Sequence, residues 1–591
     1  MISSRASRML SRYAVSARTC ASSPLHYDSS MKILSAAEMQ TCDRVTTEQF
    51  GIPSIDLMRN AAHAVASFVR RQFPAARRIT ILCGRGYNGG DGLMTARLLA
   101  EDGLEVTTLL LGDPGGLKGD AAQAWADLTA MRPSKNAIRI VRHPEELEVQ
   151  TDLLAADLIV DAVLGTGFQP AMRGLPLAVL SWLQDSLRSS KNSPKILAID
   201  LPSGWDADST AATQPGPVYP ADAVVTFTAP KPAHVLGQLT RSLWQPIVVA
   251  SIGSPDEAIV SSLNLHWSGA SKSITDPERP PDSNKGMYGH VLVVGGSQGK
   301  SGAPAMTSLA ALRTGAGLVT AAVAPTVLPL VAAIAPELMT KALAVTSCGE
   351  ISPENLTPEN LKSLVDRITV LAIGPGLGTS PEATEFALGL LTQSDLPAVV
   401  DADGLNALAT QPELLPKIAK GRTLVLTPHP GEMSRLARMS IAEIQANRLE
   451  IARDFAIKNQ VTLVLKGWRT LVAHPDGAVA VNTTGNPGMA KGGSGDLLTG
   501  MVAAMLAQHP KDPRRAIEAA VYLHGLAADI TVHQPGIGGD QHTLLATDAL
   551  ANLYLAFRFH PQAESGYGWL QGLPPEPSPQ SGLNHGHPGA S

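Results

Sequence analysis

The chain has 591 residues, about twice the size at which one hydrophobic core stops growing, so a single-domain protein is excluded. Hydrophobic residues make up 44% of it, charged residues 17% and aromatic residues 4%, a balance that favours α/β domains with small aliphatic cores. The net charge of -5 leaves no excess of cations for a phosphate backbone, so we expect no nucleic acid as a partner.

The cysteines and the apolar segments indicate the compartment. The four cysteines form no C-x-x-C pair, so neither a zinc cluster nor a disulfide framework is expected, and a reducing compartment is the default. The longest uncharged stretch, 314–336, is interrupted by glycine and proline, which argues against a membrane span. We therefore expect a cytoplasmic protein with no membrane partner.

The two ends of the chain differ in composition from the rest. Residues 1–30 combine four arginines with many serines and have no acidic residue before Asp28, which is typical of a mitochondrial transit peptide. Alternatively, Met31 is the natural start and 1–30 is an extension from a misplaced start codon. The tail 559–591 is rich in Pro, Gly and Ser and is predicted to be disordered.

Between its two ends, the chain is divided by one change in amino-acid composition. Between 268 and 285 the chain collects Ser, Asp, Lys and Pro and lacks an apolar run, so 261–285 is predicted to be a linker. The halves that it separates, 31–260 and 286–558, share no motifs, which predicts two different domains.

The first half begins its sheet with a strand at 79–83, followed by a glycine-rich loop, GRGYNGGDG, and a helix. Glycines let the backbone approach a ligand at a helix N-terminus, where unpaired N–H groups favour an anion. No acidic residue is well placed after the next strand to bind a ribose, because LLLG precedes Asp113. Hydride transfer on an ordinary dinucleotide is therefore disfavoured.

Polar residues also follow two further predicted strands, in VDAVLGTGF and AIDLPSG. Ligands bind beyond the carboxyl ends of parallel strands, so Asn88, Asp91, Asp161 and Asp200 are expected to converge on one crevice. Taken singly, each is more often a helix cap or turn former. Three strand ends carrying such residues together favour a site.

These blocks, with MKILSAAEMQTCDRV, resemble the NAD(P)H-hydrate epimerase family along nearly all of 31–254. The resemblance implies a Rossmann-like three-layer sandwich in which Asp200 is catalytic and lies at the reacting ring of the hydrated cofactor. It also implies a potassium ion at Asn88, Asp161 and Ser203, a ligand set that suits a weakly hydrated cation. The implied substrate contacts are Tyr87, Asn88, Gly89, Gly90, Asp91, Gly165, Thr166, Gly167, Phe168, Gln169, Pro170, Ala171 and Asp200. A second acid–base residue is not assigned.

The second half alternates predicted strands with helical segments, which indicates another parallel α/β sandwich. In GNPGMAKGGSGD, Gly492 to Gly495 can form an anion nest at a helix N-terminus. Asp496 follows on the first helical turn, where it can take a proton from an attacking hydroxyl. A plain N-cap aspartate is the competing interpretation.

The second half resembles the ribokinase-like fold and, within it, the NAD(P)H-hydrate dehydratase family over roughly 284–555. The match rests on GGSQGKSGAPAM, IGPGLG, VVDADGLN, LTPHPGE, LKGWRT and GNPGMAKGGSGD. It implies that Asp496 is catalytic, that the hydrate contacts Ala303, Gly376, His429 and Asp496, and that ADP contacts Lys466, Gly467, Trp468, Arg469, Thr470 and Gly495. Mg²⁺ is expected to offset charge on the transferred phosphoryl group.

The two resemblances together imply repair of hydrated NADH and NADPH: epimerisation of the R and S forms, then ADP-dependent dehydration of the S form. The expected partners are the two hydrates, ADP and further copies of the chain in a homo-oligomer. A ribokinase-like vitamin-precursor kinase is the alternative, and an RNA-associated scaffold is a second alternative that the acidic balance disfavours. Whether ADP or ATP is preferred stays open.

Overall fold

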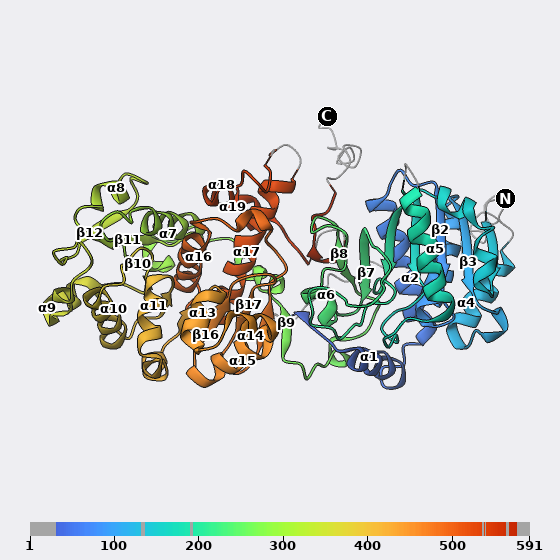
Figure 1. Cartoon of the computed structure of the whole chain (residues 1–591), viewed down its shortest axis with the longest axis horizontal. Helices are drawn as coiled ribbons and strands as arrows, with labels where there is room; N and C mark the ends of the chain where they lie inside the picture. Colours follow the sequence, from blue (N-terminus) through green and yellow to red (C-terminus); the bar gives the residue numbers. More distant parts are fainter. Residues whose placement is uncertain are drawn as a thin grey trace, which may run out of the picture.

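The computed structural model describes residues 31–131, 136–189, 193–534, 537, 539–562 and 566–575. The leader predicted at 1–30 lies outside these residues. The described chain forms two α/β halves side by side along the long axis (Figure 1), each built on its own sheet. The expected α/β class is confirmed.

The sheet of the N-terminal half has eight strands in the order β19-β8-β7-β6-β5-β2-β3-β4. All neighbours are parallel except β19 and β8. Parallel strands need crossovers, and helices on both faces leave these strands buried and almost purely apolar. The strands are β2 Arg78–Cys83, β3 Glu105–Leu111, β4 Asn136–Val141, β5 Leu158–Ala162, β6 Lys195–Ile199, β7 Ala223–Phe227, β8 Ile247–Ala250 and β19 Gly568–Gln571.

Separate apolar clusters lie on the two faces of this sheet. Helices α2, α3 and α4 contribute to one, and α5 contributes Val179, Leu180 and Leu183 to the other. The helices are α1 Ala36–Glu48, α2 Ser54–Gln72, α3 Tyr87–Glu101, α4 Gly119–Ala130, α5 Gly174–Ser189 and α6 Pro232–Leu236. The half is a three-layer sandwich, as expected.

The sheet of the C-terminal half has eleven strands in the order β1-β9-β18-β17-β16-β15-β14-β13-β10-β11-β12. The run from β12 to β16 is parallel, while β17 and β18 turn back in antiparallel pairs. The strands are β1 Met31–Lys32, β9 Leu265–Trp267, β10 His290–Val294, β11 Leu318–Val323, β12 Met339–Ala342, β13 Val370–Ile373, β14 Ala398–Val400, β15 Leu424–Leu426, β16 Thr462–Leu465, β17 Leu471–Ala473 and β18 Val479–Val481.

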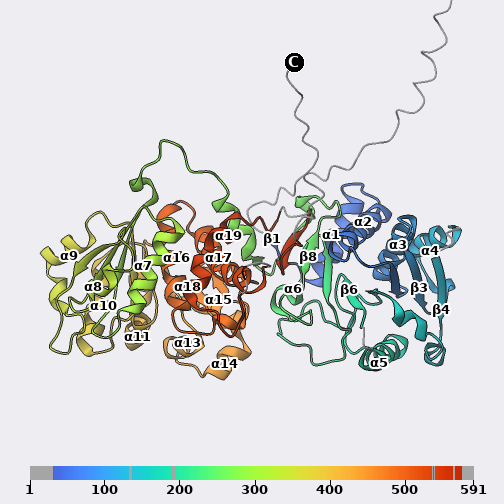
Figure 2. The ribbon, with the colours of Figure 1, turned by 90° about the horizontal axis from the view of Figure 1, so that it is seen from above.

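Helices lie on both sides of this second sheet (Figure 2), and α7 and α16 pack closely on each other. The helices are α7 Gly302–Thr314, α8 Leu328–Ala332, α9 Pro358–Val365, α10 Pro381–Gln393, α11 Asp403–Thr410, α12 Leu415–Ala419, α13 Pro430–Ala437, α14 Ile441–Ala446, α15 Arg448–Asn459, α16 Ser494–Gln508, α17 Pro513–His533, α18 Ala546–Ala551 and α19 Leu553–Arg558. This is the three-layer layout predicted for the second half.

The ends of the described chain exchange partners between the halves. Strand β1, at the start, pairs with β9 in the C-terminal sheet, and β19, at the end, pairs with β8 in the N-terminal sheet. The prediction of a disordered tail is therefore wrong at 568–571. Tyr567, Trp569 and Leu570 bury apolar side chains there, and a run this short is hard to detect within a Pro- and Gly-rich tail.

The predicted linker is also partly wrong. Residues 265–275 form β9 and a 3-10 helix, Ser268–Thr275, both within the C-terminal half. Trp267 is fully buried and donates its indole N–H to Thr483 Oγ1 at 2.8 Å. The Ser-rich composition suggested exposure, but these small polar side chains are buried and hydrogen bonded to interior partners.

The two halves meet through one shared apolar cluster that contains side chains from both sheets. Gln571 bridges the junction: its Oε1 accepts from Arg469 Nη2 at 2.5 Å, and its Nε2 donates to Thr240 Oγ1 at 2.9 Å. A core that is continuous across the boundary holds the halves in a defined relation.

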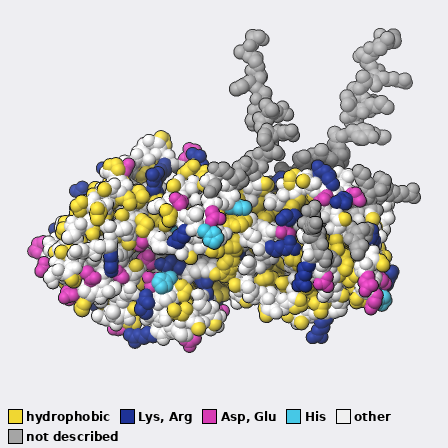
Figure 3. Space-filling model, turned by 45° about the horizontal axis from the view of Figure 1, so that its top comes forward, with side chains coloured by type: hydrophobic (Ala, Val, Ile, Leu, Met, Phe, Trp, Pro, Cys, Tyr) yellow, Lys and Arg dark blue, Asp and Glu magenta, His cyan; other side chains and the backbone are white. Residues whose placement is uncertain are grey.

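On the face seen in Figure 3, basic and acidic side chains are interspersed over both halves. None of the helices in the described part of the chain is both long enough and apolar enough to cross a bilayer.

A buried polar cluster fastens β9 to the C-terminal half. Glu518 of α17 is 1% exposed; its Oε1 lies 2.8 Å from Nε2 of His266 and of His474, and its Oε2 accepts from Ser271 Oγ at 2.5 Å. Burial alone would raise the pKa of Glu518, but the neighbouring imidazoles and these hydrogen bonds outweigh it and hold the pKa below its usual range.

We expect Glu518→Gln to lower the free energy of unfolding by roughly 1.5–3 kcal/mol at pH 7, because a charge-assisted buried network is lost. Since the folded-state pKa lies below the unfolded one, Glu518 contributes fully above the unfolded value, about 4.3, and its contribution is lost progressively as the pH falls from there through the folded-state pKa. Urea unfolding at pH 7 and at about pH 3 measures both effects. Exposed Glu385→Gln on α10 is the control, and equal stability of the two variants at pH 7 would contradict the assignment.

Candidate active sites

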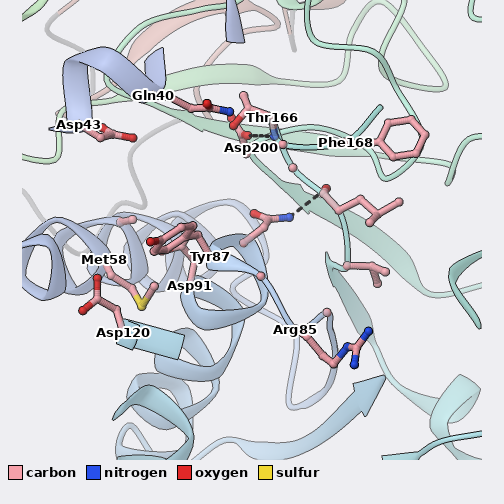
Figure 4. Close-up of a pocket in the computed structure, with 18 of the residues that line it drawn as sticks. Gln40, Asp43, Met58, Arg85, Tyr87, Asp91, Asp120, Thr166, Phe168 and Asp200 are labelled. Carbon is pink, nitrogen blue, oxygen red and sulfur yellow. Dashed lines mark hydrogen bonds between the residues drawn. The ribbon is translucent and has the colours of Figure 1, made fainter. Parts of the chain in front are cut away.

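A cavity of about 1440 Å³ opens at the carboxyl ends of β2, β5 and β6 in the N-terminal half. Helices α1, α2 and α3 supply much of its wall, so that residues far apart in sequence face one space (Figure 4). This is where an open parallel sheet places its ligand.

Asp200 follows β6 and reaches the cavity in a left-handed conformation, with φ +66°. Its Oδ1 accepts from Lys231 Nζ at 2.8 Å and Thr226 Oγ1 at 2.9 Å, and its Oδ2 accepts from the backbone N–H of Thr166 at 3.0 Å. Lys231 is 1% exposed. A strained backbone and a buried ion pair therefore hold this carboxylate in place.

The carboxyl groups of the cavity differ in pKa. Burial alone would raise the pKa of Asp200, but the charge of Lys231 and the hydrogen bonds hold it below its usual range. Burial, with the charge of Asp200, raises the pKa of Asp91 well above its usual range and that of Asp43 to about 6. The cavity thus combines a stable anion with carboxyls that can carry protons near neutral pH.

Glycines let the loops of the cavity come close together. A Cβ added to Gly89 would lie 1.9 Å from the carbonyl oxygen of Gly84, and one added to Gly165 would lie 3.1 Å from Asp200 Oδ2. Only glycine permits the first approach. The second would crowd both Asp200 and Asn88, so the absence of a side chain at Gly165 lets the loop pass close to the carboxylate.

Asn88 is the best candidate for a cation ligand. Its Oδ1 is buried without a hydrogen-bond partner among the described residues, and its Nδ2 donates to Leu164 O at 3.0 Å. Asp161 is already engaged: its Oδ1 accepts from Ser203 Oγ at 2.6 Å and Val163 N at 3.2 Å, and its Oδ2 accepts from Ser203 N at 2.8 Å. Asn88 Nδ2 and Ser203 Oγ both donate to Leu164 O, the latter at 3.3 Å, so their side chains border the same loop. Amide and hydroxyl oxygens are ligands that a weakly hydrated cation takes.

Most residues predicted for the N-terminal site do line the cavity: Tyr87, Asn88, Asp91, Gly165, Thr166, Gly167, Phe168 and Asp200. Gly89 and Gly90 are buried in α3 behind the surface, and Gln169, Pro170 and Ala171 are not part of the lining. Sequence reasoning missed Lys231 and Asp43. The only available signal for Lys231 was a lysine between two prolines in an apolar segment, TAPKPAHVL.

The C-terminal site is built around the start of α16. Gly493, with φ +94°, ends the glycine turn, and Asp496 lies on the first turn of the helix. Burial and the nearby charge of Asp401 raise the pKa of Asp496 to about 6, while Lys466 partly offsets this. The carboxylate is therefore suited to accept a proton near neutral pH.

Lys466 links the carboxylates of this site. Its Nζ donates to Asp401 Oδ1 at 2.9 Å and lies 3.8 Å from Glu432 Oε2, while Thr499 Oγ1 donates to Asp401 Oδ2 at 2.9 Å. A Cβ added to Gly495 would lie 3.2 Å from Lys466 Nζ. The predicted Gly495, Asp496 and Lys466 are thus brought together.

Two residues predicted to contact the nucleotide, Trp468 and Arg469, have their side chains at the junction between the halves. Arg469 is buried, and its guanidinium donates to Gln571 and to Thr483 O at 2.6 Å, so only its main chain is free for a nucleotide. Trp468 donates its indole N–H to Leu236 O at 2.9 Å. The loop between β16 and β17 therefore contacts both the site and the N-terminal half.

The remaining predicted residues lie on loops around the sheet. His429 caps α13, its Nδ1 accepting from Gly431 N at 3.0 Å. Gly376 has φ +65°, and Ala303 lies on the first turn of α7. Within the described residues, no group of three or more His, Cys, Asp or Glu could hold a metal ion by itself.

Fold and sites together define a two-centre α/β enzyme, with an acid–base cavity in one half and a glycine-nest carboxylate in the other. Residues 291–550 match the sequence family described as NAD(P)H-hydrate dehydratase, and residues 54–233 match the family described as YjeF-related protein N-terminus.

Relatives match across both halves. The bifunctional NAD(P)H-hydrate repair enzyme of Moorella thermoacetica is 42% identical over 88% of this chain and 95% of its own length, and that of Coxiella burnetii is 37% identical over 87% and 97%. The chain belongs to the family of bifunctional NAD(P)H-hydrate repair enzymes. A crystal structure of ADP/ATP-dependent NAD(P)H-hydrate dehydratase from Bacillus subtilis, with ATP and Mg²⁺, is 32% identical and covers 49% of this chain and 96% of its own, with a TM-score of 0.41.

Proposed function

We propose that this chain repairs hydrated NADH and NADPH. Its N-terminal half, 31–260, interconverts the R and S forms of the hydrate, and its C-terminal half, 286–558, dehydrates the S form with ADP, yielding NADH or NADPH, AMP and phosphate. The observation that carries the proposal is Asp496, a carboxylate with its pKa raised to about 6 beside a glycine turn at a helix N-terminus.

Phosphoryl transfer needs a base for the attacking hydroxyl and donors for the charge on phosphorus. Asp496 takes the proton from the C6 hydroxyl of the S hydrate, and that oxygen attacks the β-phosphoryl group of ADP. Backbone N–H groups of 492–495 stabilise the transferring group. AMP leaves as the new O–P bond forms. The ring nitrogen lone pair then expels phosphate from C6 to give a C6=N1 iminium, and loss of a proton from C5 to solvent restores the dihydronicotinamide.

Nucleotide and hydrate each have proposed contacts in this half. The nucleotide contacts Lys466, Gly467, Trp468, Arg469, Thr470 and Gly495, with Trp468 and Arg469 contributing main-chain groups. The hydrate contacts Ala303, Gly376, His429 and Asp496.

Mg²⁺ suits the C-terminal site because it binds through one or two carboxylates and the phosphates of a nucleotide, and would neutralise charge there. Burial and the charge of Asp401 raise the pKa of both Asp496 and Glu432, although Lys466 lowers each. Such surplus negative charge favours a cation that is held mainly by the phosphates of the bound nucleotide, beside Asp496.

In the N-terminal half, Asp200 is the proposed catalytic anion at the reacting ring, with the hydrate held by Tyr87 through Asp91 and by 165–171. Lys231 keeps Asp200 ionised. The negative charge of Asp200 then stabilises a ring that becomes cationic during epimerisation. K⁺ is the proposed cation near Asn88, Asp161 and Ser203, supported by the unpartnered Asn88 Oδ1.

A spectrophotometric assay with mixed R and S hydrate tests the proposal. With ADP present, the purified chain is expected to regenerate the absorbance of the reduced nicotinamide from both forms, releasing AMP and phosphate. A vitamin-precursor kinase, given an alcohol substrate and ATP, would instead release a stable phosphorylated alcohol. No gain in absorbance with either ADP or ATP overturns the proposal. The expected homo-oligomer and cytoplasmic location stay predictions.

A further inference from the structure

Asp43 is a carboxyl group in the N-terminal cavity that no step described so far uses. It lies on α1 and lines the cavity, and its Oδ1 is buried with no hydrogen-bond partner among the described residues. An unsatisfied buried acceptor costs about 1–3 kcal/mol, so folding alone gives no reason for a carboxyl here.

The helix that carries Asp43 is firmly placed beside Asp200. Ser35 and Glu38 form a capping box at its start, and the backbone N–H of Leu34 donates to Pro230 O at 3.0 Å, next to Lys231. The position of Asp43 in the cavity is therefore fixed by α1 rather than by a mobile loop.

Asp43 and Asp200 enter the cavity from different walls. Figure 4 shows Asp43 on α1 and Asp200 at a strand end, with the helix that carries Tyr87 and Asp91 across from them. A ring seated in the cavity below them therefore has both carboxyl groups along one side. Lys231 donates directly to Asp200 and lowers its pKa. Of the two carboxyl groups, Asp200 is therefore the one held firmly as an anion.

We propose that Asp43 is the acid–base residue of the epimerisation reaction, working beside Asp200; the inference rests on the function proposed above for this cavity. Burial raises the pKa of Asp43 to about 6, which allows proton exchange close to neutral pH.

The step balances as follows. The C6–O bond of the hydrate breaks with its electron pair on oxygen, the Asp43 carboxyl donates its proton to that oxygen, and water leaves. The ring nitrogen lone pair forms a C6=N1 iminium, whose positive charge the Asp200 carboxylate stabilises. Water then adds to the other face and loses a proton to solvent, and the Asp43 carboxylate regains a proton from solvent.

The test is Asp43→Asn, which keeps size and shape but removes the exchangeable proton. We expect kcat for epimerisation to fall about 100-fold with KM changed less than threefold, and Asp43→Glu to restore part of kcat. Asp56→Asn is the matched control: it is half-exposed on α2, where it pairs only with Arg59, and it lies outside the cavity lining.

Dehydration of pure S hydrate with ADP by the same Asp43→Asn sample reports that the C-terminal half is intact, and thermal unfolding of that sample against wild type reports whether the N-terminal half has folded. Wild-type chain that fails to epimerise would refute the proposed function itself. Wild-type chain that epimerises, together with an Asp43→Asn variant that keeps kcat within threefold, overturns the role of Asp43 alone. Loss of kcat that Asp43→Glu does not restore at all also counts against it.

Discussion

Replacing Asp496 by Asn is expected to abolish ADP-dependent dehydration of the S hydrate while leaving epimerisation intact. The amide cannot take the proton of the attacking hydroxyl, and general-base catalysis alone contributes about 10²–10⁴-fold. Steady-state assays of the two reactions on one purified sample measure the effect, with kcat rather than KM expected to change.

The matched control is Asp454→Asn, an exposed aspartate on α15 of the same half. Dehydration within threefold of wild type by the Asp496 variant would remove Asp496 from the role of base. Parallel loss of both reactions would indicate misfolding, which thermal unfolding of the same sample would detect.

Replacing Asp200 by Asn should leave the R hydrate unconsumed beyond its spontaneous epimerisation, because the charge opposite the cationic ring is lost. We expect a decrease of about 10²–10³-fold in kcat, comparable with the removal of one preorganised electrostatic group in other active sites. The rate of R-form clearance, coupled to excess dehydratase and ADP, measures it.

This variant also has a cost in stability. Lys231 would stay buried without its partner, and removing one member of a buried pair costs about 3–5 kcal/mol. The double variant Asp200→Asn with Lys231→Met removes both charges and should recover stability without recovering epimerisation. Recovery of both would mean that Asp200 acts on folding only.

The parts of the sites that were predictable follow from the topology of parallel sheets. Asn88 and Asp200 follow β2 and β6, and the carboxyl ends of neighbouring strands meet at one edge, so their convergence on the cavity needs only the strand assignments. Asp161, also expected in the crevice, is instead the fourth residue of β5 and is buried behind the cavity against Ser203. Asp496 was predictable because its glycine turn and helix are adjacent in sequence.

The parts that were missed depend on contacts between distant segments. Lys231 contacts Asp200 from 31 residues away, and Asp43 reaches the cavity on a helix that precedes the whole sheet. Arg469 was expected to contact a nucleotide, but its side chain donates to Gln571, 102 residues away in the tail expected to be disordered. No local periodicity encodes such pairings.

The exchange of β1 and β19 has a consequence for synthesis on the ribosome. Residues 31–250 leave the ribosome long before 568–571. Until β19 is synthesised, the edge of β8 that pairs with it has no hydrogen-bonding partner strand. An unpaired edge can template pairing with another chain, which makes this interval the vulnerable one for aggregation. A stop codon shortly before 568 would thus spare every catalytic group and still leave the N-terminal sheet without its last strand, β19.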